Sequence, residues 1–189
     1  MQIILMRHGK PDLYLEVLKR RKVSPTEVGE IVRDYEGSAL SPDTTPPEDS
    51  RAMALECGAA ISSDLLRATQ SIKRLGVQDS ASVDPEFTES AMPYLRWQWP
   101  KLAFYTYCII FRVFWFAGFS SNGEAYRTAK IRSARCAAKL EHCAADKGSV
   151  LFLGHGIMNR LISRDLKRLG WSVKRKGGDD YWSYSVFHK

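Results

Sequence analysis

Short apolar runs alternate along the chain with longer segments in which apolar residues recur at helical spacing. Apolar runs at 2–6, 59–62 and 149–153 predict buried strands. Weaker strand patterns follow, at 81–87, 171–175 and 181–188. Helices are predicted between the strands, at 13–21, 25–35, 48–57, 63–75, 123–146 and 156–169. This alternation indicates an α/β fold, a three-layer sandwich with a mostly parallel central sheet, in one domain that spans residues 1–189.

Local signals predict where two of these helices begin. Ser24 is a suitable N-cap for a helix that has Pro25 at its first position. Ser63 and Asp64 are expected to cap the next well-defined helix, which Gly76 ends.

A segment rich in Trp, Phe, Tyr and Ile interrupts the alternation and predicts a helical insertion, or cap, at 93–146. Its most apolar part, 102–119, barely reaches the length of a membrane span and carries Arg112 near the middle, where a charge costs about 2.5–3.5 kcal/mol. A single crossing also could not return to the same domain. We therefore expect a buried aromatic helix over the active site, with a dimer contact or a surface membrane contact as the alternatives.

Composition places the chain among ordinary globular proteins, with 44% hydrophobic and 26% charged residues. The net charge of +7 comes from scattered Lys and Arg, which favours a solvated basic surface over nucleic-acid binding.

The four cysteines form no C-x-x-C pair and are interpreted as buried thiols in a reducing compartment. The apolar run at the amino terminus is too short for a signal peptide, so a cytoplasmic location is expected.

Groups suited to phosphate chemistry follow three of the predicted strands. Arg7-His8-Gly9 follows the first strand, Arg67 lies in the first turn of a helix after the second, and Gly154-His155-Gly156 follows the strand at 149–153. Ligands bind beyond the carboxyl ends of parallel strands, so these groups would converge if the strands are neighbours. Arginine matches phosphate oxygens bidentately, and a neutral histidine can attack phosphorus. Glycines beside the histidines would let a ligand approach the backbone and leave N–H groups available to it.

The leaving alcohol also needs a proton, for which Asp84, Glu86 and Glu89 lie at the end of a strand. The residues alone do not distinguish Glu86 from Glu89. Arg67 taken alone could equally be a helix-surface charge, and Gly154 to Gly156 partially matches a dinucleotide fingerprint without its third glycine. The chain has no P-loop, no H-E-x-x-H, no G-x-S-x-G and no histidine spacing typical of a metal site. We therefore expect no metal and no cofactor.

The ordered set of motifs resembles the histidine phosphatase superfamily, in the branch of the phosphoglycerate mutases. The resemblance rests on Arg7-His8-Gly9, on the stretch from Ser62 to Gln70, on Phe87-Thr88-Glu89 and on Gly154-His155-Gly156, which together span most of the chain. It implies that His8 is the phosphorylated nucleophile, that Arg7, Gly9, Arg67 and His155 surround the phosphate, and that Glu89 is the acid. It also implies that the segment between Glu89 and His155 covers the site.

Two departures from that family pattern narrow the expected function. Many members carry an acidic or amide residue after the first motif, then Thr, and Asn three positions later, where this chain has Lys10, Pro11 and Tyr14. The stretch from Ser90 to Pro93 also lacks the basic and aromatic residues with which the mutases hold phosphoglycerate. We therefore expect a metal-independent phosphomonoesterase with a phosphohistidine intermediate. The alternatives are a mutase-type phosphotransferase and a catalytically weak phosphate-binding protein of the same fold. The expected partner is a small phosphate ester with an apolar or aromatic body, and neither nucleic acid nor a membrane.

Overall fold

The structure is a computed structural model that describes residues 1–13, 17–18 and 21–189. Contacts within the chain define two compact units. The first unit consists of Met1–Pro11, Ala39–Glu89 and Ile131–Lys189, and the second of Asp12–Ser38 and Ser90–Lys130. The predicted insertion at 93–146 falls partly in each unit, and its role as a cover stays a prediction.

A six-stranded sheet forms the centre of the first unit, in the order β4-β3-β6-β1-β8-β7. Its strands are β1 (Gln2–Arg7), β3 (Ala59–Ser62), β4 (Ala81–Val83), β6 (Ser149–Gly154), β7 (Ser172–Arg175) and β8 (Tyr184–His188). The strands from β4 to β1 run parallel, whereas β8 is antiparallel to both of its neighbours. The mostly parallel sheet is therefore confirmed. The pairing of Arg7 with Gly154 sets the carboxyl ends of β1 and β6 side by side.

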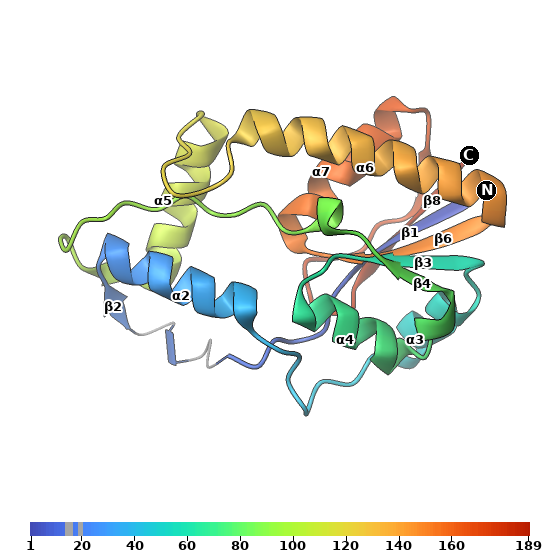
Figure 1. Cartoon of the computed structure of the whole chain (residues 1–189), viewed down its shortest axis with the longest axis horizontal. Helices are drawn as coiled ribbons and strands as arrows, with labels where there is room; N and C mark the ends of the chain where they lie inside the picture. Colours follow the sequence, from blue (N-terminus) through green and yellow to red (C-terminus); the bar gives the residue numbers. More distant parts are fainter. Residues whose placement is uncertain (14–16, 19–20) are drawn as a thin grey trace. The chain divides into compact units, whose positions relative to one another are not determined.

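Helices cover both faces of this sheet, which gives the three predicted layers (Figure 1). One face carries α3 (Glu48–Leu55) and α4 (Leu66–Leu75), and the other carries α7 (Gly156–Arg168) and most of α6 (Tyr126–Lys147). Side chains alternate between the faces of a strand, and Ile4, Met6, Leu151 and Leu153 share one buried cluster with Ile72 and Leu75 of α4. This apolar burial fixes the strands whose ends carry the candidate site.

The predicted elements of the first unit are largely confirmed, with two corrections. The run at 81–87 forms a strand only as far as Val83, because Pro85 begins a short 3₁₀ helix, Pro85–Phe87, which Asp84 caps through the Glu86 N–H at 2.9 Å. Another 3₁₀ turn, Gln78–Ser80, precedes this strand. The predicted cap at Ser63 and Asp64 is wrong, since α4 begins at Leu66 and its N-cap, Leu65, makes no side-chain cap bond.

The second unit contains α2 (Pro25–Gly37), α5 (Phe104–Phe116) and a small antiparallel pair of strands, β2 (Lys22–Val23) and β5 (Leu102–Ala103). Ser24 caps α2 as predicted, in a capping box with Glu27. Most of the helix predicted at 13–21 lies outside the described residues.

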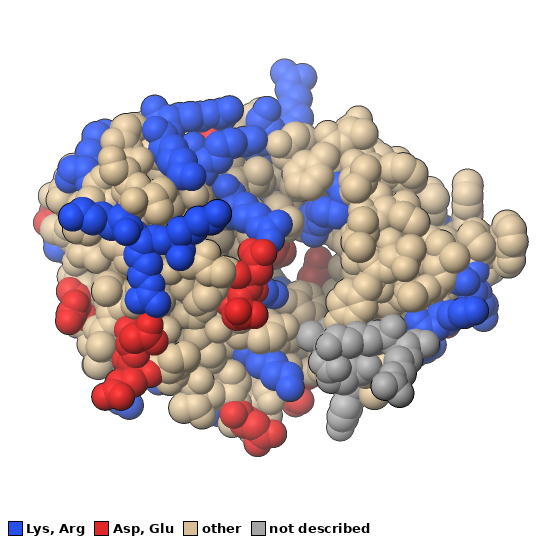
Figure 2. Space-filling model, turned by 180° about the vertical axis from the view of Figure 1, so that it is seen from behind, with Lys and Arg blue, Asp and Glu red and all other residues tan. Residues whose placement is uncertain are grey.

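The aromatic helix α5 is buried on one face only. Phe104, Tyr107, Phe111 and Trp115 are buried, whereas its opposite face exposes other apolar side chains, among them Ile109, Val113 and Phe116. The helix expected to be buried at 102–119 therefore spans Phe104–Phe116 and has only one buried face, and its place over the active site stays a prediction. On the face shown in Figure 2, much of the second unit is neither acidic nor basic, whereas Lys and Arg gather on the first. Within the described ranges, no helix is both long and apolar enough to cross a membrane.

Candidate active site

Adjacent strand ends bring the two predicted histidines together in the first unit. His8 follows β1 and His155 follows β6, and their ring centroids lie 4.9 Å apart. Both side chains are buried. Arg67, in the first turn of α4, is also fully buried and donates from Nε to His8 Nε2 at 3.2 Å. Three of the predicted site residues therefore meet at one edge of the sheet, and Arg67 is not the surface charge it could have been.

The partners of His8 define where its hydrogen lies. Nδ1 is 2.7 Å from the carbonyl oxygen of Gly9, which can only accept, so Nδ1 carries the hydrogen. Nε2 accepts from Arg67 and therefore keeps a lone pair. Burial, together with the nearby Arg67 guanidinium, lowers the pKa of His8 to about 3. His8 is thus a neutral imidazole at neutral pH, and its unprotonated nitrogen lies beside a fixed cation.

His155 has a different set of contacts from His8. Its Nε2 is 2.6 Å from the hydroxyl oxygen of Ser63, which is itself buried at the end of β3. Its Nδ1 is buried and has no hydrogen-bond partner among the described residues. Burial lowers the pKa of His155 well below its ordinary value, and the charges of His8, Arg67 and Arg7 act in the same direction. Buried polar atoms without a partner are uncommon in folded proteins, so Nδ1 is a candidate contact for a ligand.

Arg7 lies at the end of β1, where its guanidinium stacks over the Tyr181 ring at 4.6 Å and donates to the Asp179 carbonyl oxygen. Its Nε is buried and, within the described part of the chain, without a hydrogen-bond partner. The same arginines that lower the pKa values of the histidines create a positive potential at this sheet edge. The N-terminus of α7 adds to that potential. The arrangement is suited to a phosphate group.

The structure distinguishes the two candidate acids that the residues alone left open. Glu89 accepts the N–H groups of Ile157 at 3.1 Å and Met158 at 3.0 Å through its two carboxyl oxygens, in the first turn of α7. This holds its carboxyl beside the segment that begins with His155. Glu86 instead pairs with Arg135 and, at 2.7 Å, with Lys139 of α6. Glu89 thus contacts the helix that follows His155, whereas Glu86 contacts α6.

The backbone N–H of Gly9 does not have the contact that the sequence led us to expect. Its N–H donates to Ser71 Oγ at 3.0 Å, so it is not available to a ligand in this structure. A Cβ at this position would lie 2.3 Å from Cζ2 of the buried Trp182 ring and 2.8 Å from Leu40. Close packing therefore requires glycine at position 9. This packing accounts for the glycine, and no contact with phosphate is needed to explain it.

The residues that depart from the family pattern lie just beyond Gly9. Lys10 is exposed, and its backbone bonds to Thr44 and Ser41. Pro11 forms an isolated bridge with Leu40, and Tyr14 lies outside the described residues. Wherever the chain is described, no three His, Cys, Asp or Glu side chains are placed to hold a metal ion.

Several residues around the site were missed from the sequence. Ser63 contacts His155, and Asp179, Tyr181 and Trp182 form the wall beside Arg7 and Gly9. The only signal for Ser63 was its place directly after a strand, which also fits a helix cap. The wall residues precede β8, whose position beside β1 depends on the whole sheet.

Comparisons with solved structures show a shared fold at low sequence identity. A mycobacterial glucosyl-3-phosphoglycerate phosphatase in complex with VO3 superimposes with a TM-score of 0.59 at 20% identity, over 98% of this chain and 91% of that one. The product of open reading frame Rv3214 of Mycobacterium tuberculosis gives 0.62 at 17% identity, over 98% and 89% of the two chains. The corresponding values for a putative alpha-ribazole-5'-P phosphatase of Escherichia coli are 0.53 and 18%, over 89% and 79%.

The chain has the fold of the histidine phosphatases. No protein-family description matches the sequence, and no curated protein does. At these identities the likeness establishes the fold and leaves the activity to the site itself.

Proposed function

We propose that the chain is a phosphomonoesterase that forms a phosphohistidine on His8. The observation that carries the proposal is the state of His8: a buried, neutral imidazole whose unprotonated Nε2 accepts a hydrogen bond from the Nε of the buried Arg67 at 3.2 Å. A histidine held in this way is ready to attack, and the fixed cation beside it attracts the phosphoryl group.

The reaction has two balanced steps. The substrate phosphate takes the Arg67 N–H in place of His8 Nε2, which then attacks phosphorus, so that an N–P bond forms and the P–O bond to the alcohol breaks. Glu89 gives its proton to the departing oxygen. Water then attacks the phosphohistidine, Glu89 takes a proton from that water, and inorganic phosphate leaves with His8 restored.

The remaining groups act on the phosphoryl oxygens. The buried Nε of Arg7 is a donor that needs an acceptor, and so is the buried Nδ1 of His155 in the tautomer whose Nε2 accepts the Ser63 hydroxyl; phosphoryl oxygens supply that acceptor. Loss of one such preorganised donor typically costs about 10²–10³ in rate. Substitution of Arg67 or His155 should therefore slow the hydrolysis of all substrates similarly.

The structural neighbours add support at the level of reaction class. Two of them are a glucosyl-3-phosphoglycerate phosphatase, studied with VO3 and with inorganic phosphate, and a putative alpha-ribazole-5'-P phosphatase. Vanadate commonly mimics the pentacoordinate phosphorus that forms during phosphoryl transfer. These names support a phosphatase of small-molecule esters and do not select the substrate.

The proposal is tested with a panel of phosphate esters, assayed with wild-type and His8→Ala protein in the presence of EDTA. We expect hydrolysis of several esters by the wild type, vanadate inhibition, and no turnover by His8→Ala. Matched circular dichroism spectra would show that the variant folds. Equal turnover by both proteins would overturn the mechanism, and phosphate binding without turnover by the wild type would favour the non-enzymatic alternative.

A further inference from the structure

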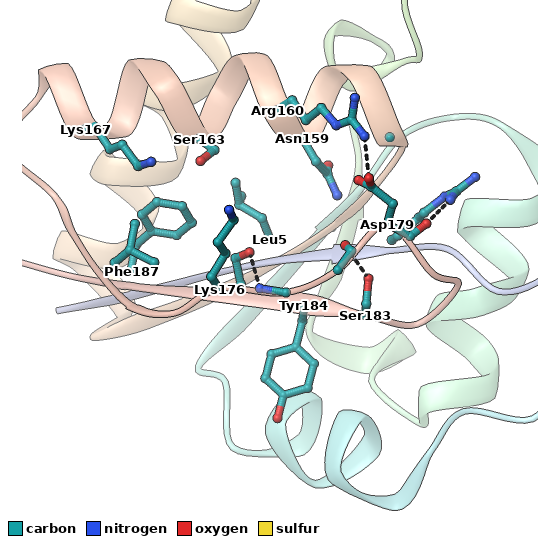
Figure 3. A pocket seen from close by; sticks show the side chains of 16 residues that line it. Leu5, Asn159, Arg160, Ser163, Lys167, Lys176, Asp179, Ser183, Tyr184 and Phe187 are labelled. Atoms are coloured by element: carbon teal, nitrogen blue, oxygen red, sulfur yellow. Dashed lines mark hydrogen bonds and ion pairs between the residues drawn. The ribbon is translucent and has the colours of Figure 1, made fainter.

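A cavity of about 700 Å³ lies in the first unit between α7 and the hairpin formed by β7 and β8 (Figure 3). It begins at Arg7 and Gly156, the residues that adjoin the two histidines, and extends along α7 to Lys167. This volume is typical of a ligand pocket. The cavity therefore shares Arg7 with the proposed phosphate site, whereas His8, Arg67 and His155 do not line it, and none of the steps above uses it.

One face of α7 forms the wall of this cavity. The lining residues Gly156, Arg160, Ser163 and Lys167 are spaced so that they share one side of the helix. At about 1.5 Å of rise per residue, the stretch from Gly156 to Ser163 covers about 10 Å. The floor includes the apolar side chains of Leu5 and Phe187. The cavity thus has an apolar middle and leads away from the phosphate site.

Cations exceed anions around the far part of the cavity. Arg160 forms an ion pair with Asp179 at 2.5 Å, and this bond, with a smaller contribution from the charge of Lys176, lowers the pKa of the Asp179 carboxyl; neither Lys167 nor Lys176 lies within ion-pair distance of a carboxylate in the described residues. Figure 3 shows the Lys176 side chain reaching from the hairpin toward α7. Exposed lysines are usually only solvated. These two differ because they line the same concave surface, which has Arg7 at its other end.

Building on the proposed phosphatase activity, we propose that this cavity binds a second anionic group of the substrate. The substrate class is an elongated phosphate ester in which about 10 Å of largely apolar chain separates the scissile phosphate from a distal phosphate or carboxylate, the reach of seven residues of α7. Lys176, whose side chain reaches from the hairpin toward α7, binds the distal anion together with Lys167, which lies one turn beyond Ser163, and Arg7 lies at the end of the cavity nearest the scissile phosphate.

The experiment compares hexyl phosphate with 1,6-hexanediol bisphosphate, which share a primary alkyl leaving group and differ in the distal anion. For the wild type we expect a KM per phosphate group that is about tenfold lower for the bisphosphate, as for a hydrogen bond between charged groups. Lys167→Gln/Lys176→Gln should raise that KM to the hexyl phosphate value and leave hexyl phosphate unchanged. The double variant Lys73→Gln/Lys174→Gln removes the same charge from exposed positions outside the cavity and should keep the preference.

Equal KM values for the two esters in the wild type would overturn the inference, and so would an equal loss of preference in the control variant. Calorimetric titration of His8→Ala protein with the bisphosphate, with and without the two cavity substitutions, separates this inference from the proposed function. If neither ester is hydrolysed but the cavity substitutions still weaken binding, the cavity assignment holds and the phosphatase proposal fails.

Discussion

The ends of β1 and β6 lie side by side and carry the same dipeptide, histidine followed by glycine, yet their surroundings differ. Both nitrogens of His8 are engaged, by Gly9 and Arg67, whereas His155 bonds Ser63 through Nε2 and leaves Nδ1 without a partner in the described structure. A Cβ at Gly9 would clash with Trp182, whereas a Cβ at Gly156 would meet nothing within 4 Å.

This difference shows that an identical local sequence can serve two purposes within one site. At β1 the packing fixes the backbone and the ring, which suits an attacking atom that must not move. At β6 the ring keeps one polar atom for a ligand, and the open glycine begins a helix that Glu89 contacts. Each prediction below changes one end and leaves the other intact.

The largest effect is expected at the β6 end, from Glu89→Gln. Acid catalysis typically contributes about 10²–10⁴ in rate, so alkyl phosphates should lose activity on that scale while aryl phosphates, whose leaving groups need less protonation, lose much less. Steady-state rates on both ester classes measure this. Glu86→Gln is the matched control, because Glu86 pairs with α6 instead. An equal loss on both classes would mean that Glu89 only caps α7.

Replacement of Gly9 and of Gly156 by alanine should change the stability of the protein by different amounts. Gly9→Ala forces a methyl group into Trp182 and should reduce the free energy of unfolding by about 1–3 kcal/mol. Gly156→Ala adds a methyl group to open space in a helix and should leave stability unchanged or raise it by about 0.4–1 kcal/mol. Urea unfolding compares the two. Similar losses in both variants would remove the proposed difference in packing.

Ser63→Ala should lower kcat by about tenfold through the loss of one hydrogen bond that positions His155, with little change in KM. The neighbouring hydroxyl of Ser62 is buried and has no partner in the described residues, which makes Ser62→Ala a close control. Kinetics on one aryl phosphate separate the two variants. If Ser62→Ala lowers kcat as much as Ser63→Ala does, the effect comes from packing and the positioning role is wrong.

The pH dependence of stability tests the burial of both histidines. Their folded-state pKa values lie below the ordinary value, and that of His8 is about 3. Between that value and the unfolded value of about 6.5, the unfolded chain binds protons that the folded protein excludes. Stability should therefore fall as the pH drops from about 6.5 toward about 3, by up to about 1.4 kcal/mol per pH unit for each histidine.

Replacing one histidine should make this slope shallower. Urea unfolding of wild-type, His8→Asn and His155→Asn protein at several pH values provides the comparison. An unchanged slope in both variants would show that other groups cause the acid sensitivity and that the histidines are accessible to protons.

The sequence was informative where contacts are local or where strands are buried. The run Ala59–Ser62 was predicted residue for residue, and the positions of His8, Arg67 and His155 followed from strand ends. The sequence was misleading where a residue has two possible partners. Ser63 has the chemistry of a helix cap but bonds a histidine 92 positions away. The apolar pattern of α5 likewise gives no sign of which face is buried.

The central claim is that His8 Nε2 takes the phosphoryl group, and rapid quenching during turnover tests it most directly. With a phosphorus-labelled ester, we expect an acid-labile, base-stable phosphoprotein whose label maps by mass spectrometry to the peptide that contains His8 and is absent from His8→Ala protein. A label on another residue, or full hydrolysis by His8→Ala protein, would contradict the account.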